Sequence, residues 1–169
     1  IDTCNISPES IRQAITPKTK AIIVVHWNGI PANMKEILKI AKEYDLFVIE
    51  DSAPALGGEY YGKKLGTIGD VGCYSFQGAK VAIGGQGGAL VTNKKKIYEK
   101  AKILASYGRT DTKKTYWSDF VGWNYTMPNL PAALALSQVT RLDDLIKRKR
   151  EIFQLYCENL KNLKGKIFF

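Results

Sequence analysis

Lys80 is the residue whose type and position most clearly indicate covalent chemistry. It follows an apolar strand pattern at 71–76 by four residues and precedes the glycine run at 84–88. A lysine in a crowded, glycine-lined cleft is poorly solvated, which favours a nucleophilic amine able to form a Schiff base with a carbonyl group. Taken alone, a lysine beside glycines is more often a residue of a surface loop.

Asp51 and Ser75 supply the other groups that a pyridoxal 5′-phosphate site needs. Such a site requires a carboxylate at the pyridine nitrogen, because a protonated ring is the better electron sink, and it requires donors for the phosphate. Asp51 lies at the end of the apolar pattern at 46–49, and Ser75 lies on the strand pattern just before Lys80. Singly, Asp51 could be a helix N-cap and Ser75 a buried strand hydroxyl. The three residues together favour the cofactor.

Alternating strand and helix patterns predict the elements that position these residues. Continuous apolar runs at 21–25 and 46–49 predict strands buried on both faces, and apolar residues recur at helical spacing over 34–44. A strand–helix–strand unit of this kind requires a right-handed crossover and a parallel strand pair, so the predicted fold class is α/β. Ligands of such sheets lie beyond the carboxyl ends of the strands, where the sequence places His26 and Asp51.

The other patterns predict the elements around this unit. Ser7 and Pro8 indicate the N-cap and the first residue of a helix that ends near Ala14. Further elements are a hairpin at 59–66, a strand at 89–92, and helices at about 94–106 and 129–162 with a break near 140–144. A polar, aromatic loop at 107–128 joins the last two helical regions.

Composition limits the class of protein. The 169 residues are 45% apolar and 11% aromatic, which excludes a disordered or collagen-like chain and fits one domain. No apolar run approaches the roughly 20 residues of a membrane span. The three cysteines (Cys4, Cys73 and Cys157) are far apart and lack CxxC spacing, which favours reduced thiols in the cytoplasm over disulfides. With a single histidine, the chain offers no cluster of metal ligands.

The net charge of +9 is concentrated in the second part of the chain. Residues 1–92 hold equal numbers of basic and acidic side chains, whereas 93–169 hold the whole excess, most densely at 94–96 and 147–150. Such clusters could form an anion-binding face for nucleic acid or a phosphorylated ligand. Both clusters lie in helical patterns, have acidic neighbours and lack interleaved aromatics, so solvated helix faces are favoured over nucleic-acid binding.

The sequence resembles the DegT/DnrJ/StrS family of pyridoxal-phosphate-dependent sugar aminotransferases. The stretch at 48–93, VIEDSAPALGGEYYGKKLGTIGDVGCYSFQGAKVAIGGQGGALVTN, contains the motifs EDxA, SFxxxK and GxGG in order and at family-like spacing. The similarity continues upstream through the strand–helix–strand unit and downstream through VGWNYTMPNLPAALALSQVTRLDDLIKRKREI at 121–152. It covers essentially the whole chain.

The resemblance implies the large domain of a fold-type-I transferase, with a mostly parallel sheet flanked by helices. Residues 1–142 would belong to this cofactor-binding domain, and 143–169 would form a helix leading toward a small C-terminal domain. The chain begins at Ile1 without an export leader and ends at 166–169 in what resembles the start of a strand. We therefore expect a central piece of a longer protein, with the N-terminal part and the small domain outside it.

The resemblance also implies roles for four residues. Lys80 matches the Schiff-base lysine, Asp51 the partner of the pyridine nitrogen, and Ser75 a ligand of the cofactor phosphate. Asn124 matches an asparagine that reaches the cofactor phosphate of the other subunit in family dimers. Without the resemblance, Asn124 would be read as a turn residue beside aromatics.

Three departures from the family pattern concern the substrate more than the cofactor. Pro54 stands where the family commonly has Gln or His in contact with the cofactor ring, and Gln86 replaces the usual acidic residue of the glycine run. The segment at 124–129 lacks the Arg and Glu of the family. His26 matches a family histidine, for which a structural role near the cofactor is favoured over that of general base.

The implied function is transfer of an amino group from an amino acid, usually glutamate in this family, to a nucleotide-linked keto sugar, in polysaccharide or glycoconjugate biosynthesis. The expected partners are these small molecules and a second copy, in a homodimer with a shared active site; neither nucleic acid nor a membrane is expected. The isolated 169 residues are expected to be inactive. One alternative is a non-catalytic or regulatory member of the fold, motivated by Pro54 and Gln86. Another is a pyridoxal-phosphate-dependent sugar dehydratase, in which a histidine replaces the lysine matched by Lys80.

Overall fold

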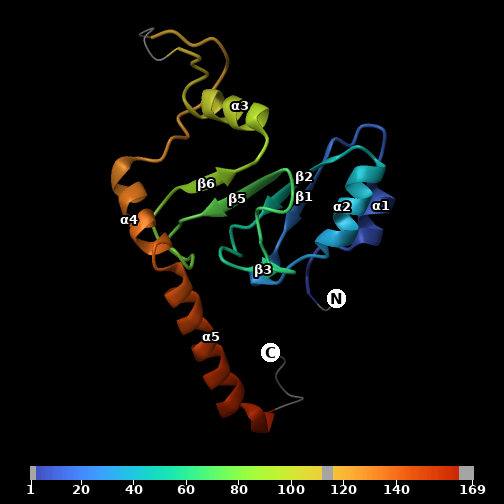
Figure 1. Ribbon diagram of the computed structural model, residues 1–169, viewed down its shortest axis with the longest axis vertical. Coiled ribbons are helices and arrows are strands. Elements are labelled where there is room, and N and C mark those ends of the chain that lie inside the picture. Colours follow the sequence, from blue (N-terminus) through green and yellow to red (C-terminus); the bar gives the residue numbers. More distant parts are fainter. Residues whose placement is uncertain (1–2, 112–115, 164–169) are drawn as a thin grey trace.

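The computed structural model describes residues 3–111 and 116–163 and has the α/β architecture expected from the sequence (Figure 1). Parts of the predicted loop at 107–128 and of the C-terminal segment lie outside the described residues. The helices are α1 (Pro8–Ala14), α2 (Met34–Glu43), α3 (Lys95–Ala105), α4 (Asn129–Val139) and α5 (Leu142–Asn159), with 3-10 turns η1 (Trp27–Gly29) and η2 (Lys161–Leu163). The strands are β1 (Ala21–Val25), β2 (Phe47–Asp51), β3 (Glu59–Tyr60), β4 (Lys63–Lys64), β5 (Val71–Ser75) and β6 (Gly88–Val91).

The main sheet is mostly parallel, as expected. Its order is β1-β2-β5-β6, with β1, β2 and β5 parallel to one another and β6 antiparallel to β5. The register pairs Val25 with Asp51 and Asp51 with Cys73. The carboxyl ends of the three parallel strands therefore meet at one edge of the sheet, which is where open α/β sheets bind ligands.

Capping residues and helical periodicity determine α1 and α2. Ser7 Oγ accepts a hydrogen bond from the amide of Ser10 at 3.0 Å and Pro8 occupies the first turn, which confirms the predicted start of α1. Asn33 caps α2 through the amide of Glu36. The apolar sides of both helices pack on the sheet in a core formed by Ile11, Ile22, Val24, Ala32, Met34, Ile37, Ile40, Ala41 and Val48.

The prediction that β1 and β2 are buried on both faces is wrong for the described chain. Burial alternates along each strand, so that Ile22 and Val24 are buried whereas Ile23 is 63% exposed. On β2, Val48 is buried and Phe47 is 51% exposed. Successive side chains of a strand point to opposite faces, and among the described residues the α1–α2 core covers only one of them.

The hairpin and the helix break lie where the sequence predicted them. β3 and β4 are joined by Tyr61 and Gly62, both at positive φ, which is the backbone geometry of a tight two-residue turn. Thr140 and Arg141 separate α4 from α5, which extends away from the sheet (Figure 1). Among the helices of the described residues, none has the length and apolar character needed to cross a bilayer.

Truncating a core residue of α2 should destabilise this fold strongly. Ile37 is fully buried, so Ile37→Ala should lower the free energy of unfolding by about 2–5 kcal/mol through lost apolar contact and a cavity. Lys39→Ala on the exposed side of the same helix should change it by about 0.5 kcal/mol or less. Urea unfolding followed by circular dichroism measures both values, and equal effects of the two variants would contradict the assigned core.

Candidate active site

Lys80 lies in a loop that leaves β5 and returns to β6. The amide of Gly84 donates to the carbonyl of Phe76 at 2.7 Å, and the amide of Phe76 donates to the carbonyl of Gly87 at 2.9 Å. Inside this closed loop, the amide of Lys80 donates to the carbonyl of Gln77 at 2.9 Å. The half-buried lysine is therefore presented by a turn whose two ends are fixed at the sheet.

The glycine run forms the return of this loop. Gly85 and Gly87 have φ of 84° and 92°, a left-handed backbone that side chains with a Cβ disfavour. The glycine run does not itself line the cavity at Lys80, whose wall is formed by Asn28, Ala53, Pro54, Leu56, Ala79, Val81 and Lys149. The glycines shape the chain path that places the lysine, and the cavity wall comes from other loops.

The Lys80 cavity lies beyond the carboxyl ends of two parallel strands. It has a volume of about 310 Å³, and its wall includes Asn28 from the segment after β1 and Ala53 and Pro54 from the segment after β2. Lys149 of α5 contributes a second amine to the same cavity. Pro54, the first of the three departures from the family pattern, thus faces the same space as Lys80.

Asp51 is the last residue of β2 and is half-buried. Its Oδ1 accepts a hydrogen bond from the amide of Ala53 at 3.1 Å, and its carbonyl accepts one from the amide of His26 at 3.2 Å. Burial, together with the negative charge of Asp51, raises the pKa of the neighbouring Cys73 thiol. The Asp51 carboxylate is thus oriented at the end of its strand, two residues before a wall residue of the Lys80 cavity.

Ser75 ends β5, the strand next to β2. It lies two residues beyond Cys73, the register partner of Asp51, which corresponds to about 7 Å along the strand. Its hydroxyl accepts a hydrogen bond from the amide of Gln77 at 3.3 Å, at the beginning of the Lys80 loop. The structure therefore gathers Asp51, Ser75 and Lys80 at the same edge of the sheet.

Asn124 does not join this group within one chain. It is exposed, it pairs with Ser106 in an isolated bridge, and its Oδ1 accepts a hydrogen bond from Thr126 at 3.2 Å. It is not among the residues that line the Lys80 cavity.

A buried carboxylate next to Asp51 connects three segments of the chain. Oε2 of Glu50 accepts hydrogen bonds from His26 Nε2 at 3.0 Å and from the amide of Gly66 at 2.9 Å; its Oε1 accepts from the amides of Ile68 and Gly69, both at 2.6 Å. Burial opposes ionisation of this carboxyl, but the hydrogen bonds from His26 and the three amides outweigh it. The pKa of Glu50 is therefore lowered from its usual value.

His26 is fully buried and uses both ring nitrogens in this network. The amide of Ala32 donates to Nδ1 at 3.2 Å, so the ring proton on Nε2 is the one donated to Glu50. These contacts support the structural role that the sequence favoured for His26.

Sequence reasoning missed Glu50 and Lys149. The available signal for Glu50 was a charged residue continuing an apolar strand, which needs a partner if it is buried. For Lys149 there was no such signal, because its contact with the cavity depends on where α5 lies. The described residues contain no group of three or more His, Cys, Asp or Glu side chains placed to bind a metal ion.

Neutralising Glu50 should destabilise the protein in a pH-dependent way. Glu50→Gln removes a buried charge that accepts four hydrogen bonds, so the free energy of unfolding at pH 7 should fall by about 2–4 kcal/mol. Because the folded-state pKa is lowered, the charge stabilises the fold fully above the unfolded value of about 4.3. The difference between wild type and variant should therefore shrink as the pH falls below that value.

Urea unfolding between pH 3 and pH 8 measures this dependence. Glu43→Gln, at an exposed ion pair with Arg12, is the matched control and should cost about 1 kcal/mol or less. A difference between wild type and Glu50→Gln that stays constant down to pH 3 would contradict a lowered pKa.

Comparison with known proteins identifies the family. Residues 1–168 match the DegT/DnrJ/EryC1/StrS aminotransferase family. The chain is 44% identical over 162 residues to the GDP-perosamine synthase of Escherichia coli O157:H7, covering 96% of this chain and 44% of that protein. It is 42% identical over 163 residues to the dTDP-3-amino-3,6-dideoxy-alpha-D-galactopyranose transaminase of Aneurinibacillus thermoaerophilus, again covering 96% and 44%.

Solved structures of aminotransferases have the same fold. The X-ray structure of the aminotransferase from Psychrobacter cryohalolentis superposes with a TM-score of 0.87 at 31% identity, covering 97% of this chain and 44% of that one. The chain therefore spans less than half the length of each of these three proteins. The match over nearly all of its residues shows that the chain belongs to the DegT/DnrJ/EryC1/StrS family of aminotransferases, which have the fold-type-I architecture and depend on pyridoxal phosphate.

Proposed function

We propose that the complete protein is a pyridoxal-phosphate-dependent aminotransferase that transfers an amino group from glutamate to a nucleotide-linked keto sugar. The observation that carries this proposal is the position of Lys80, which lines a cavity beyond the ends of the parallel strands, at the same edge as Asp51 and Ser75. The names of the two sugar-modifying relatives support the substrate class. Polysaccharide or glycoconjugate biosynthesis is the setting that we infer for this reaction.

The residues present fit the cofactor. The Lys80 cavity, at about 310 Å³, lies in the size range of small-molecule sites. Asp51 Oδ1 is bound to a backbone amide, whereas Oδ2 has no hydrogen bond to any described residue and can face a protonated ring nitrogen. The Ser75 hydroxyl can donate to the phosphate. Pro54 can offer the ring only apolar contact.

The chain's own groups then divide the work. Pyridoxal phosphate, when bound, would supply an electron sink for negative charge at the substrate's α-carbon. Lys80 Nζ would hold the cofactor covalently and, once free, would move a proton as general base and then general acid. The negative charge of Asp51 would keep a proton on the ring nitrogen. The hydrogen bond from Ala53 keeps its carboxylate oriented during both halves of the reaction.

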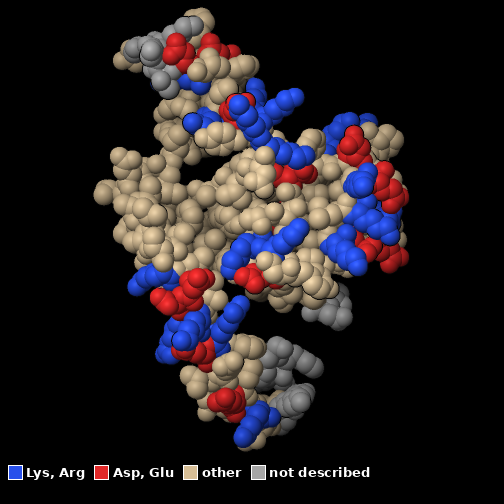
Figure 2. Space-filling model, in the orientation of Figure 1, with Lys and Arg blue, Asp and Glu red and all other residues tan. Residues whose placement is uncertain are grey.

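We propose a homodimer as the working unit. Large exposed apolar patches are typical of protein interfaces, and the described chain exposes Trp123, Tyr125, Leu130, Leu134, Leu136 and Val139. Figure 2 shows a broad region without charged side chains over α4. Asn124 lies within this apolar segment, which is consistent with a role at the cofactor phosphate of the other subunit.

The domain assignment and the location in the cell follow the same proposal. Residues 1–142 would form part of the large domain, and 143–169, which include most of α5, would lead toward a small domain. Cys4, Cys73 and Cys157 are all free thiols, which supports a reducing compartment such as the cytoplasm.

Replacing Lys80 should abolish covalent cofactor attachment. Lys80→Arg keeps a positive charge but provides no amine able to form the bond. The complete wild-type protein with added pyridoxal phosphate should show an absorbance band between 300 and 500 nm. Borohydride should remove that band and leave the label on Lys80; the variant should remain unlabelled. Lys63→Arg, at an exposed hairpin residue, should behave as wild type. The absence of this absorbance band from the wild-type protein with added cofactor would contradict the proposal.

Replacing Asp51 should separate cofactor binding from turnover. Asp51→Asn keeps the size of the side chain but removes the charge that holds the ring proton. The amino-donor half-reaction with glutamate should therefore slow by about 100-fold or more, while the cofactor still binds. Stopped-flow absorbance measures that rate, with Asp45→Asn at an exposed turn as the control. Equal rates for wild type and Asp51→Asn would remove Asp51 from the assigned role.

A further inference from the structure

A second cavity extends the Lys80 cavity along α5. It has a volume of about 300 Å³ and shares Asn28, Pro54, Leu56, Val81 and Lys149 with the Lys80 cavity. From there it continues to Ile146, Arg150 and Phe153 of α5. We call the two cavities together the α5 trough; it runs from Lys80, between α5 and the segment at 53–58, toward Phe153.

One face of α5 forms a wall of this trough. Ile146, Lys149, Arg150 and Phe153 are spaced at i, i+3, i+4 and i+7, so a single side of the helix presents all four. The opposite wall is the segment at 53–58. A Cβ at Gly57 would overlap the side chain of Ile146, which shows that α5 lies close to this segment.

The charged residues that line the trough are all basic. Its lining contains the basic residues Lys80, Lys149 and Arg150, and no aspartate or glutamate is among the residues that line either cavity. Because Lys80 is assigned to the cofactor, Lys149 and Arg150 are the basic groups of the lining that remain to attract an anion.

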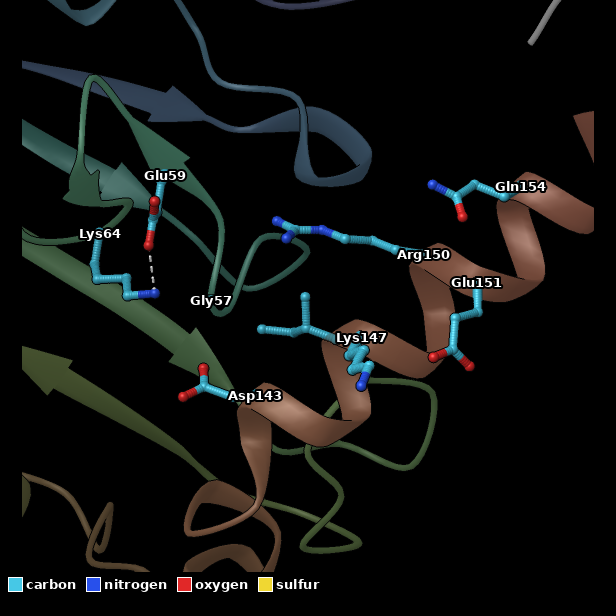
Figure 3. Close-up of a pocket in the computed structure, with 9 residues that line it drawn as sticks. Gly57, Glu59, Lys64, Asp143, Lys147, Arg150, Glu151 and Gln154 are labelled. Atoms are coloured by element: carbon cyan, nitrogen blue, oxygen red, sulfur yellow. Dashed lines mark hydrogen bonds and ion pairs between the residues drawn. The ribbon is translucent and has the colours of Figure 1, made fainter.

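The pocket next to the trough differs in this respect. Figure 3 shows Arg150 extending from α5 toward the segment of Gly57, with the ion pair of Glu59 and Lys64 beyond it, at 2.6 Å. That pocket is lined by three acidic and three basic side chains, which are Glu59, Asp143, Glu151, Lys64, Lys147 and Arg150. The balance of charges there favours no anion, whereas the lining of the trough contains basic residues and no acidic one.

We propose that the α5 trough binds the diphosphate group of the acceptor substrate, with Lys149 and Arg150 as its ligands. Arginine can bind two phosphate oxygens at once and lysine adds a compact charge. The ligand is then a nucleoside-diphosphate-linked sugar, whose keto carbon points toward Lys80 and whose nucleoside lies toward Phe153. This inference rests on the proposed aminotransferase function for the identity of the group at Lys80.

The basic cluster at 147–150 offers a control on the same helix. Arg148 forms an ion pair with Glu151 at 3.1 Å and lines neither cavity of the trough. If the cluster acted only as a solvated helix face, Arg148 would be equivalent to Lys149 and Arg150. The proposal requires that they differ.

The test measures binding of GDP, dTDP and inorganic pyrophosphate to the complete protein by isothermal titration calorimetry. The double variant Lys149→Gln with Arg150→Gln should bind these probes at least about tenfold more weakly, because two charged hydrogen-bond donors are lost. Arg148→Gln should bind them as wild type, and Lys149→Arg should keep most of the affinity. Unchanged affinity in the double variant, an equal loss in Arg148→Gln, or a wild type that binds none of the probes would overturn the proposal.

A second measurement separates this site from the proposed function. The double variant should keep the cofactor band and the half-reaction with glutamate, since neither involves the diphosphate. If the wild type lacks that band but its affinity for GDP or dTDP falls in the double variant, the anion site stands and the aminotransferase proposal fails. If the half-reaction is normal while the affinities do not change, the anion site alone is wrong.

Discussion

The ionised carboxylate of Glu50, buried at the end of β2, is the constraint on which the rest of the site depends. A buried charge is costly unless hydrogen bonds compensate it, and here His26 and the amides of Gly66, Ile68 and Gly69 do so. These partners come from the end of β1 and from the segment that leads into β5. The same carboxylate therefore joins the three parallel strands whose ends carry the site. Asp51, its neighbour in the chain, is paired in the sheet with Val25 of β1 and Cys73 of β5.

The residues of the site come from strands, a loop and a helix. Asp51 and Ser75 are strand residues whose spacing is set by the register of β2 and β5. Lys80 lies in a loop that is closed by hydrogen bonds between Phe76 at its start and Gly84 and Gly87 at its return. Lys149 reaches the same cavity from α5, beyond the break at Thr140 and Arg141. The strands and the loop between them thus hold the residues proposed for the chemistry. The position of the Lys149 amine depends instead on how α5 packs.

Sequence patterns predicted local structure well because caps, turns and helical periodicity act over a few residues. Ser7 and Pro8 began α1, and Tyr61 with Gly62 closed the hairpin. Features that depend on distant contacts were predicted less well. Apolar runs in β1 and β2 suggested burial on both faces, but Ile23 is exposed in the described chain because burial depends on what covers the strand. The hydrogen-bond partners of Glu50 and the position of Lys149 at the cavity are likewise tertiary contacts. They cannot be predicted from the spacing of residues in the sequence.

Gly57 links the proposed chemistry to the proposed substrate recognition. It has φ of 84° and lies so close to Ile146 that a Cβ would overlap the isoleucine side chain. A glycine here lets α5 approach the segment after β2, which narrows the trough between Lys80 and Phe153. Pro54, in the same segment, offers no hydrogen bond to a ligand. Polar recognition in the trough therefore falls mainly to Asn28 and to the basic residues, and an anionic acceptor would be positioned chiefly from the α5 side.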